Sequence, residues 1–338
     1  MDFSFIIPCY NVALTIDRCL NSIYSQGLNE ADFEVICVDD ASTDPNSIAS
    51  LKNYKYQGCR PANLHVIRNS VNKNTGGARN TGIKESKGDY LLFLDADDYY
   101  ISGSLLKLQE AKRNNNELDF IMFDCIRELA DGEEQSPYSN HNTSKIMSGR
   151  EFFLNQIVPN EVWVHLYKRS CIKERELMFP ENVYFEDVSF VIQFVSQSRK
   201  CRFVPITAYY YSANANENRA TFLFKNYSKI EDLFTVANRI HDVYLKIVST
   251  DPFLAKSILS HVIYYRKFYL RYIWKLPYSR LIYVLKEKRI PTTTGNTIVD
   301  FISNHPVLTA NVLFSLKPLL TIAEYLFYMS KKMKRKQN

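Results

Sequence analysis

The chain has 338 residues, which is long for a single core and suggests one large domain with an appendage or two domains. Its hydrophobic share, 46%, is ordinary for a globular protein. The formal net charge of +6 is unevenly distributed, and no uncharged apolar stretch is long enough to span a bilayer. The start, "MDFSFIIPCYN", lacks the basic leader of a signal peptide and is predicted to be a first strand.

The seven cysteines are widely spread and odd in number. They include neither a C-x-x-C pair nor the close spacing of a zinc site. We therefore expect reduced, mostly buried thiols in a cytosolic protein.

Short apolar runs alternate with helix-like patterns through the first 125 residues. The strand-like runs are "FSFIIP", "FEVICVDD", "NLHVIRN", "YLLFLDADD" and "FIMFDC". Between them, helices are predicted over residues 14–25, 47–56 and 102–114, and a Gly-bounded segment over 76–87 starts a further helix. This alternation predicts βαβ units and an α/β fold with a largely parallel sheet, covered on both faces.

The character of the sequence changes twice after residue 125. Residues 129–149 are polar and turn-rich, typical of a mobile connection or lid, and the later run "CRFVPITAYYYSAN" is typical of a strand. From about residue 226, apolar residues recur at helical spacing. We therefore predict an α/β domain over residues 1–225 and a helical C-terminal region with a basic tail over 226–338.

Polar residues follow each of the early strands at its carboxyl end. They are Tyr10 and Asn11, then Asp39 and Asp40, and then the acids of the segment 95–98. In an open parallel sheet the loops at this edge form the ligand crevice, so these side chains should converge on one site.

The acids of "YLLFLDADDYY" come directly after four apolar residues. Aspartate is a favoured turn residue, so an ordinary turn is one interpretation. Clustered carboxylates, however, repel each other and are costly to desolvate unless a cation neutralises them. Because hard divalent ions prefer oxygen ligands, a metal-binding loop is the leading hypothesis.

The segment "NTGGARNTGIKESKG" contains the spacing of a phosphate loop between Gly77 and Gly82. The residues that follow are Ile83 and Lys84 instead of Lys-Ser or Lys-Thr, which argues against a Walker-type NTPase. No G-x-G-x-x-G follows the first strand, so a nicotinamide enzyme is poorly supported as well. The remaining interpretation is a helix start that carries Arg79 and suits close approach of an anion.

Taken together, these stretches resemble the family 2 glycosyltransferases, which are inverting, nucleotide-sugar-dependent enzymes with a GT-A fold. The matching pieces are "FSFIIPCYN", "FEVICVDDASTD", "NTGGARNTGIKESKGDYLLFLDADD" and "FPENVYFEDVSF", in the family's order and spacing. The resemblance covers about residues 3–215 and leaves the helical region outside.

The resemblance implies roles for the residues at the predicted crevice. Asp95 and Asp97 match the DxD element, in which the first acid faces the ribose and the second binds Mn²⁺ or Mg²⁺ on the diphosphate. The residues that would hold the nucleotide, besides Asp95, are Pro8, Tyr10, Asn11, Asp40 and Arg79.

Glu186 and Asp187 match the family's ED motif, whose Asp is the usual catalytic base. An ionised carboxylate can accept the proton of an acceptor hydroxyl as its oxygen attacks the anomeric carbon, which gives inversion in one displacement. On its own, Asp187 would also suit a helix-capping residue before "VSFVIQF".

Trp163 and His165 lie where the family places residues near the donor sugar and the acceptor. The chain departs from the family here, because Val164 and His165 replace the more usual polar residues after the Trp. This departure leaves the sugar undetermined, and a lone His is more often structural than catalytic.

The leading hypothesis is a glycosyltransferase that moves a sugar from a nucleotide-diphosphate donor, a UDP-sugar, to a hydroxyl of a glycan or lipid-linked acceptor in cell-surface polysaccharide synthesis. We expect no nucleic-acid partner. Two alternatives stay open: an inactive nucleotide-sugar-binding scaffold, and a nucleotidyltransferase that uses two carboxylates and Mg²⁺. The released product, nucleoside diphosphate or pyrophosphate, discriminates between the two enzymes.

The C-terminus pairs an apolar segment with the basic tail "MSKKMKRKQN". An interfacial segment followed by basic residues would suit an anionic membrane surface. We therefore expect a cytoplasmic protein, peripheral at the inner face of the membrane. The alternative is a buried C-terminal helix with a solvated tail.

Overall fold

The computed structural model describes residues 1–115, 117–129, 132–135, 138, 145–212, 230–273, 277–287, 305, 308–313 and 315–316. The chain divides into two compact units. One consists of Met1–Ala220 with Leu245–Ser257, and the other of Thr221–Tyr244 with Ile258–Asn338. The domain boundary expected at residues 225 and 226 stays a prediction.

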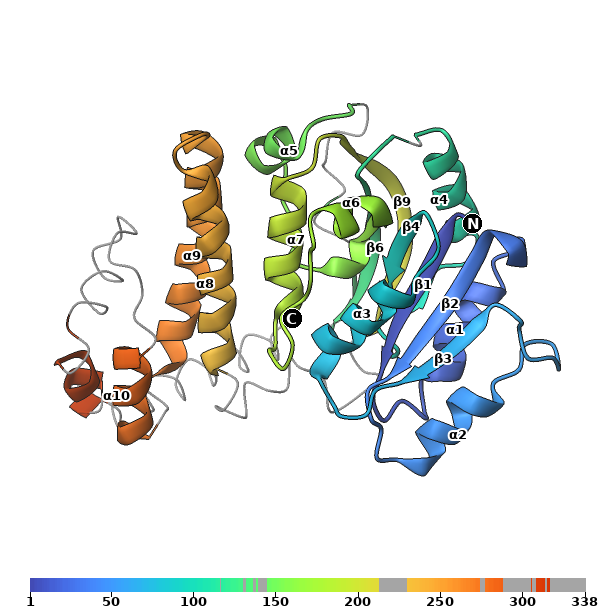
Figure 1. Cartoon of the computed structure of the whole chain (residues 1–338), viewed down its shortest axis with the longest axis horizontal. Helices are drawn as coiled ribbons and strands as arrows, with labels where there is room; N and C mark the ends of the chain where they lie inside the picture. Colours follow the sequence, from blue (N-terminus) through green and yellow to red (C-terminus); the bar gives the residue numbers. More distant parts are fainter. Residues whose placement is uncertain are drawn as a thin grey trace. The chain divides into compact units, whose positions relative to one another are not determined.

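Four parallel strands form one half of the sheet in the first unit (Figure 1). In spatial order they are β3 (Leu64–Arg68), β2 (Phe33–Asp39), β1 (Phe3–Cys9) and β4 (Tyr90–Phe93). Every residue of β2 and of β4 is buried, as the continuous apolar runs predicted. The connecting helices are α1 (Ile16–Tyr24), α2 (Pro45–Asn53) and α3 (Asn74–Glu85).

The other half of the sheet is mixed. It continues from β4 through β8 (His165–Lys168), β6 (Phe120–Leu129) and β9 (Cys201–Tyr211) to β5 (Tyr99–Tyr100), and β7 (Gly132–Gln135) pairs with β6. Of these pairings only β6 with β9 is parallel. The predicted βαβ alternation therefore holds for the first four strands, where each parallel crossover carries a helix or a long connection. The helical turns of this half are α4 (Ser104–Arg113), α5 (Gly149–Asn155), the 3-10 turn η2 (Val162–Val164), α6 (Arg169–Glu174) and α7 (Glu186–Ser196).

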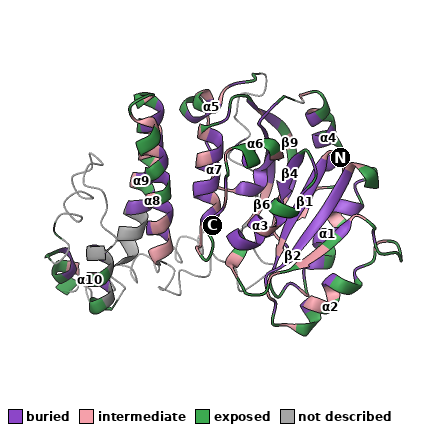
Figure 2. Cartoon of the chain, in the orientation of Figure 1, coloured by how far each residue is buried: buried purple, intermediate pink, exposed green. Residues whose placement is uncertain are grey.

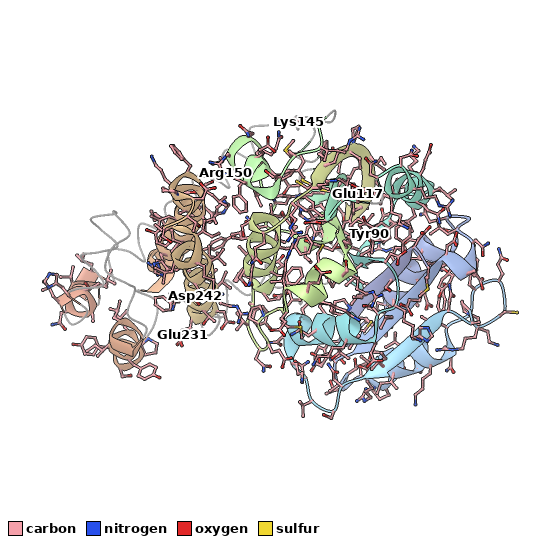
Figure 3. All side chains as sticks on the ribbon, turned by 45° about the horizontal axis from the view of Figure 1, so that its top comes forward. Tyr90, Glu117, Lys145, Arg150, Glu231 and Asp242 are labelled. Atoms are coloured by element: carbon pink, nitrogen blue, oxygen red, sulfur yellow. The ribbon has the colours of Figure 1, made fainter. Side chains whose placement is uncertain are left out.

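The core of this unit lies between the sheet and its helices, where buried residues concentrate (Figure 2). A close approach explains one glycine: a Cβ on Gly82 of α3 would lie 2.4 Å from Cγ2 of Ile6, so α3 packs directly on β1. At the start of β4, Tyr90 is buried, and its hydroxyl donates to the carbonyl of Leu118 over 2.7 Å. Glu117, the residue before Leu118, is exposed (Figure 3).

The second unit is helical in the part that the structure describes. Its helices are α8 (Ile230–Ile247), α9 (Pro252–Ile273) and α10 (Tyr278–Glu287). The end of α8 and the start of α9 lie in the segment Leu245–Ser257, which belongs to the first unit. The predicted helical C-terminal region is therefore present. Among the described residues, no helix is both long and apolar enough to cross a membrane. The basic tail, 331–338, and about half of the polar connection 129–149 lie outside the described residues.

Candidate active site

Hydrogen bonds from Asn11 join the loops that follow β1 and β2. The backbone N–H groups of Thr43 and Asp44 each donate to Asn11 Oδ1 over 3.0 Å, and the Asn11 N–H donates to Ser42 Oγ over 3.0 Å. Asn11 has a φ of +55°, a left-handed conformation that Asn tolerates better than most residues. Asn11 therefore shapes the crevice edge through the backbone of the neighbouring loop.

The two acids after β2 have protein partners. Asp39 forms an ion pair with Arg68 at the end of β3. Asp40 accepts hydrogen bonds from Asn69 Nδ2 over 2.7 Å and from the N–H of Lys73 over 2.9 Å. Burial raises the pKa of Asp40 above its ordinary value, although these hydrogen bonds oppose the shift.

Tyr10 and Pro8 lie at the same end of β1. Tyr10 is 46% exposed at the crevice edge, and Pro8 is partly buried beside Val38 of β2. Tyr10 is therefore accessible to a ligand. The nucleotide-binding roles implied for Pro8, Tyr10, Asn11 and Asp40 stay predictions.

The three acids after β4 divide into two kinds. Asp98 is fully buried and accepts from the Tyr209 hydroxyl over 2.7 Å and from the N–H of Ser212 over 2.9 Å. Its own N–H donates to the carbonyl of Asp95 over 2.9 Å, which closes a turn. Asp95 and Asp97 remain partly exposed. The turn interpretation therefore fits Asp98, and the two acids of the DxD pattern remain accessible.

Arg79 connects the acids after β4 to the ED motif. Its Nη2 donates to Asp95 Oδ1 over 2.7 Å, and its Nη1 donates to Glu186 Oε1 over 2.6 Å. The Arg79 side chain is only 3% exposed. Burial alone would lower the pKa of Arg79, but the charges of Asp95 and Glu186 raise it above its ordinary value. The guanidinium is therefore permanently charged between the two acids.

Asp187 occupies the first turn of α7, immediately after Glu186. Phe185, with a φ of +63°, is the residue that precedes the helix, so Asp187 is not its N-cap. Burial, together with the neighbouring charge of Glu186, raises the pKa of Asp187 well above its ordinary value. Burial also raises the pKa of Glu186, against the opposing charge of Arg79. A carboxylate whose pKa is raised is a stronger base, as proton abstraction requires.

Trp163 and His165 have different surroundings. The Trp163 ring stacks on Tyr209 with a centroid distance of 4.2 Å, and Tyr209 in turn accepts from the N–H of Asp95 over 3.3 Å. His165 is fully buried, with the rings of Phe120 and Tyr167 5.5 Å and 5.2 Å away. The structure thus connects Trp163 to the acids after β4 and places His165 in the core.

A charged group beside the ED motif was missed by the sequence analysis. Glu161, the residue before η2, accepts from Arg127 Nη2 over 2.6 Å and from the Tyr138 hydroxyl over 2.8 Å. Its charge contributes to the raised pKa of Asp187. The only sequence signal was an acid two positions before Trp163, and nothing in the sequence links it to Arg127.

Among the described residues, no group of three or more His, Cys, Asp or Glu side chains is arranged to hold a metal ion. Mg²⁺ is commonly bound by one or two carboxylates together with substrate phosphates and water, without an all-protein cage. Asp95 uses Oδ1 for Arg79, and both Asp95 and Asp97 are partly exposed. The two acids therefore fit a hard divalent ion that a diphosphate completes.

A sheet whose parallel strands end in acids, joined through Arg79 to an ED pair, defines an α/β protein with an acidic site at the carboxyl edge of the sheet. The model of glycosyl transferase family 2 matches residues 4–173, about half of the chain, and the protein therefore belongs to this family.

Curated relatives with longer chains share this region. A poly(ribitol-phosphate) beta-glucosyltransferase of Bacillus spizizenii is 33% identical over 214 residues, which are 62% of this chain and 32% of the relative. The uncharacterized glycosyltransferase EpsJ of Bacillus subtilis is 29% identical over 63% of this chain and 61% of its own. The poly(ribitol-phosphate) beta-N-acetylglucosaminyltransferase TarS of Staphylococcus aureus is 26% identical over 77% of this chain and 44% of its own. The chain thus spans about a third to three fifths of these relatives.

The fold matches solved structures. Residues 1–349 of S. aureus TarS, crystallised with UDP-GlcNAc, superpose with a TM-score of 0.70 at 19% identity, over 93% of this chain and 89% of that one. A further crystal structure of the same TarS segment gives a TM-score of 0.66. The predicted α/β, GT-A fold class is therefore confirmed.

Proposed function

We propose that the protein transfers a sugar from a UDP-sugar to a hydroxyl of a polyol-phosphate or related glycan acceptor, with inversion, during cell-surface polysaccharide synthesis. Family membership supports sugar transfer. TarS, the crystallised neighbour, was solved with UDP-GlcNAc, and two of the relatives are named for poly(ribitol-phosphate). The donor and the acceptor class are carried over from those names.

One observation carries the proposal: Arg79 brings an acid of the DxD pattern and the ED motif to one point, although Asp95 and Glu186 are distant in sequence. A transferase of this kind needs acids for the donor diphosphate and a base for the acceptor within one sugar's reach of each other. A binding scaffold needs only the first group.

In the proposed reaction, Asp187 accepts the proton of the acceptor hydroxyl. As the O–H bond breaks, the oxygen forms a bond to the anomeric carbon from the face opposite the nucleotide, and the bond to the diphosphate oxygen breaks. UDP leaves with that electron pair. Single displacement inverts the anomeric centre.

Asp95 and Asp97 would hold Mn²⁺ or Mg²⁺, which neutralises the charge that develops on the leaving diphosphate. Without an ion, the two carboxylates would repel that diphosphate. Tyr10, exposed at the crevice edge, and Asp40 behind it would contact the nucleoside. Trp163, stacked on Tyr209, would border the sugar.

The proposed function is tested by incubating the protein with Mn²⁺, a panel of UDP-sugars and a poly(ribitol phosphate) acceptor. We expect labelled sugar in the polymer and one equivalent of UDP released for each sugar transferred. Pyrophosphate release would identify a nucleotidyltransferase, and UDP-sugar binding with no turnover would identify a scaffold. Protection against thermal unfolding ranks the donors, because stabilisation grows with the logarithm of ligand concentration over Kd.

We further propose that the basic tail, residues 331–338, attaches the protein to an anionic membrane surface, at the inner face where a lipid-linked acceptor would be presented. The support is the sequence alone: five basic residues within "MSKKMKRKQN" and no acid.

A further inference from the structure

The guanidinium of Arg79 donates hydrogen bonds to two acids that belong to different parts of the site. Its terminal nitrogens lie 2.7 Å from Asp95 Oδ1 and 2.6 Å from Glu186 Oε1. The guanidinium also lies over the ring of Phe179, with 5.4 Å from Cζ to the ring centroid. With 3% exposure, the side chain has both terminal nitrogens committed to protein carboxylates.

The helix that carries Arg79 holds the segment before α7 at two further points. Asn80 Nδ2 donates to the Phe179 carbonyl over 3.0 Å, and the Phe179 N–H donates to Asn80 Oδ1 over 2.9 Å. A Cβ on Gly76 would lie only 2.4 Å from the Pro180 carbonyl oxygen, so the backbones of α3 and of this segment are in direct contact. Three residues in the first two turns of α3, Gly76, Arg79 and Asn80, therefore restrain the chain that leads into the ED motif.

We propose that Arg79 is a positioning residue that holds the start of α7, and with it Asp187, at a set distance from Asp95. It is not a ligand of the nucleotide, the role that the sequence predicted for it. This inference rests on the proposed function. A planar guanidinium holds two acceptors in a fixed geometry, which a Lys ammonium on a flexible stem does not. With both terminal nitrogens on carboxylates and 3% exposure, the Arg79 guanidinium offers little access to a diphosphate.

Loss of the Arg79–Glu186 bond should lower the rate of transfer and leave the affinity for the donor unchanged. Asp187 follows Glu186 directly, so loss of the Arg79–Glu186 bond allows the base to move relative to the donor. A displacement of about 1 Å in a reacting group can lower a rate by about a hundredfold. We therefore expect kcat to fall while the Kd for UDP with Mn²⁺ stays unchanged, because a group needed only for alignment acts on turnover.

The experiment compares Arg79→Lys, Glu186→Gln and the double variant with the parent. We expect kcat to fall about a hundredfold in Arg79→Lys and about tenfold in Glu186→Gln. The double variant should be no slower than Arg79→Lys, because the bond that Glu186→Gln weakens, Arg79–Glu186, is already disrupted in Arg79→Lys. Arg175→Lys is the matched control: Arg175 pairs with Asp119 over 2.9 Å and lies 5.5 Å from the Phe194 centroid. It should keep the parent kcat.

Three results would overturn the inference. The first is a Kd for UDP with Mn²⁺ that rises about tenfold or more in Arg79→Lys, which is the loss expected of a phosphate ligand. The second is a kcat in Glu186→Gln that equals the kcat of the parent protein. This result decides the question even if Arg79→Lys does not fold. The third is an additive loss in the double variant.

Failure of the proposed function is separately visible. If the parent transfers no sugar from any donor, the proposed activity is wrong, and Arg79 is then tested by chemical unfolding of the same four proteins. Non-additive losses of unfolding free energy for Arg79→Lys and Glu186→Gln support the bond as a positioning link. Additive losses contradict it.

Discussion

At the scale of single residues, Asp187 is the group whose loss should stop transfer. Asp187→Asn keeps the size of the side chain and removes the basic oxygen, so transfer should fall by at least about a hundredfold, the lower end for a general base. UDP and Mn²⁺ should bind as before. Initial rates and UDP titrations on Asp187→Asn and Glu186→Gln test this prediction. We expect the smaller loss of rate in Glu186→Gln. A near-parent rate for Asp187→Asn would falsify the choice of base.

The raised pKa of Asp187 predicts the pH dependence of transfer. Asp187 acts only when deprotonated, so kcat should fall with decreasing pH from a point above the usual Asp range of about 4. The negative charge of Glu161 contributes to this shift, so Glu161→Gln should lower the pKa of Asp187 and move the acid limb of the profile to lower pH. The pH–rate profiles of both proteins test this. Glu117→Gln, an exposed and distant change, is the control; an acid limb that stays in place in Glu161→Gln contradicts the prediction.

Asp97 should matter for the ion and the diphosphate. Asp97→Ala removes a hard oxygen ligand, so the gain in UDP affinity that Mn²⁺ provides should disappear. UDP titrations of the parent and the variant with Mn²⁺ and with a chelator measure that gain directly. Undiminished Mn²⁺-dependent affinity in the variant would remove Asp97 from the metal site.

At the scale of elements, the contact between α3 and the segment before α7 limits what position 76 can carry. In Gly76→Ala the new Cβ meets the Pro180 carbonyl oxygen at 2.4 Å and Glu186 Cγ at 3.1 Å. Backbone must move, so we expect a stability loss of about 1–3 kcal/mol and a large loss of kcat.

Gly82→Ala is the control for this element, because its Cβ would clash at the same distance with the Ile6 side chain on β1. Thermal unfolding and initial rates should show comparable destabilisation of both variants and a much smaller loss of kcat in Gly82→Ala. Equal losses of kcat would mean that the contact with Pro180 has no special effect on the site.

The order of the elements was largely predictable, including β6 and β9 of the second half of the sheet, whereas the short strands β8 and β5 were not. β2 and β4 are buried throughout and β1 nearly so, and their apolar runs are therefore visible in the sequence. β8 and β5 are only four and two residues long, and β5 follows directly on the acids after β4. Strands this short carry too few residues for a period to emerge, and pairing with distant strands makes them extended.

At the scale of the whole molecule, the basic tail predicts a surface on which the enzyme works. Deleting residues 331–338 should leave turnover of a soluble acceptor intact and weaken attachment to anionic vesicles, by at most about 1 kcal/mol for each basic residue removed. Sedimentation with anionic vesicles, and with neutral vesicles as the control, measures this. Equal binding of the full and shortened chains would remove the membrane proposal.

Two segments that are distant in sequence share one compact unit. Leu245–Ser257 belongs to the unit of the first 220 residues, where Arg150 of α5 pairs with Asp251. The chain therefore leaves that unit and returns to it. Periodicity shows that residues 230–247 are helical, but it carries no information about which unit a helix end contacts.

The sequence by itself determined that acids stand at the carboxyl ends of parallel strands and that an ED pair opens a late helix. Both features are local: a buried strand must be apolar, and the charge can begin only where the strand leaves the core. The order of the motifs was enough to indicate the family, because each motif is read along the chain without knowing what it touches.

Only the tertiary structure decided which partner each acid has. Asp98 is buried and accepts a hydrogen bond from Tyr209, 111 positions away, so it is not available to a ligand. Asp95 and Glu186 both bond to Arg79, which is 16 positions from the first and 107 from the second. Such pairs depend on how separate elements pack, and the same residue types would suit many other partners. The physical reason is that a buried carboxylate needs a hydrogen-bond donor or a counter-charge wherever the fold provides one, and sequence spacing does not specify where that is.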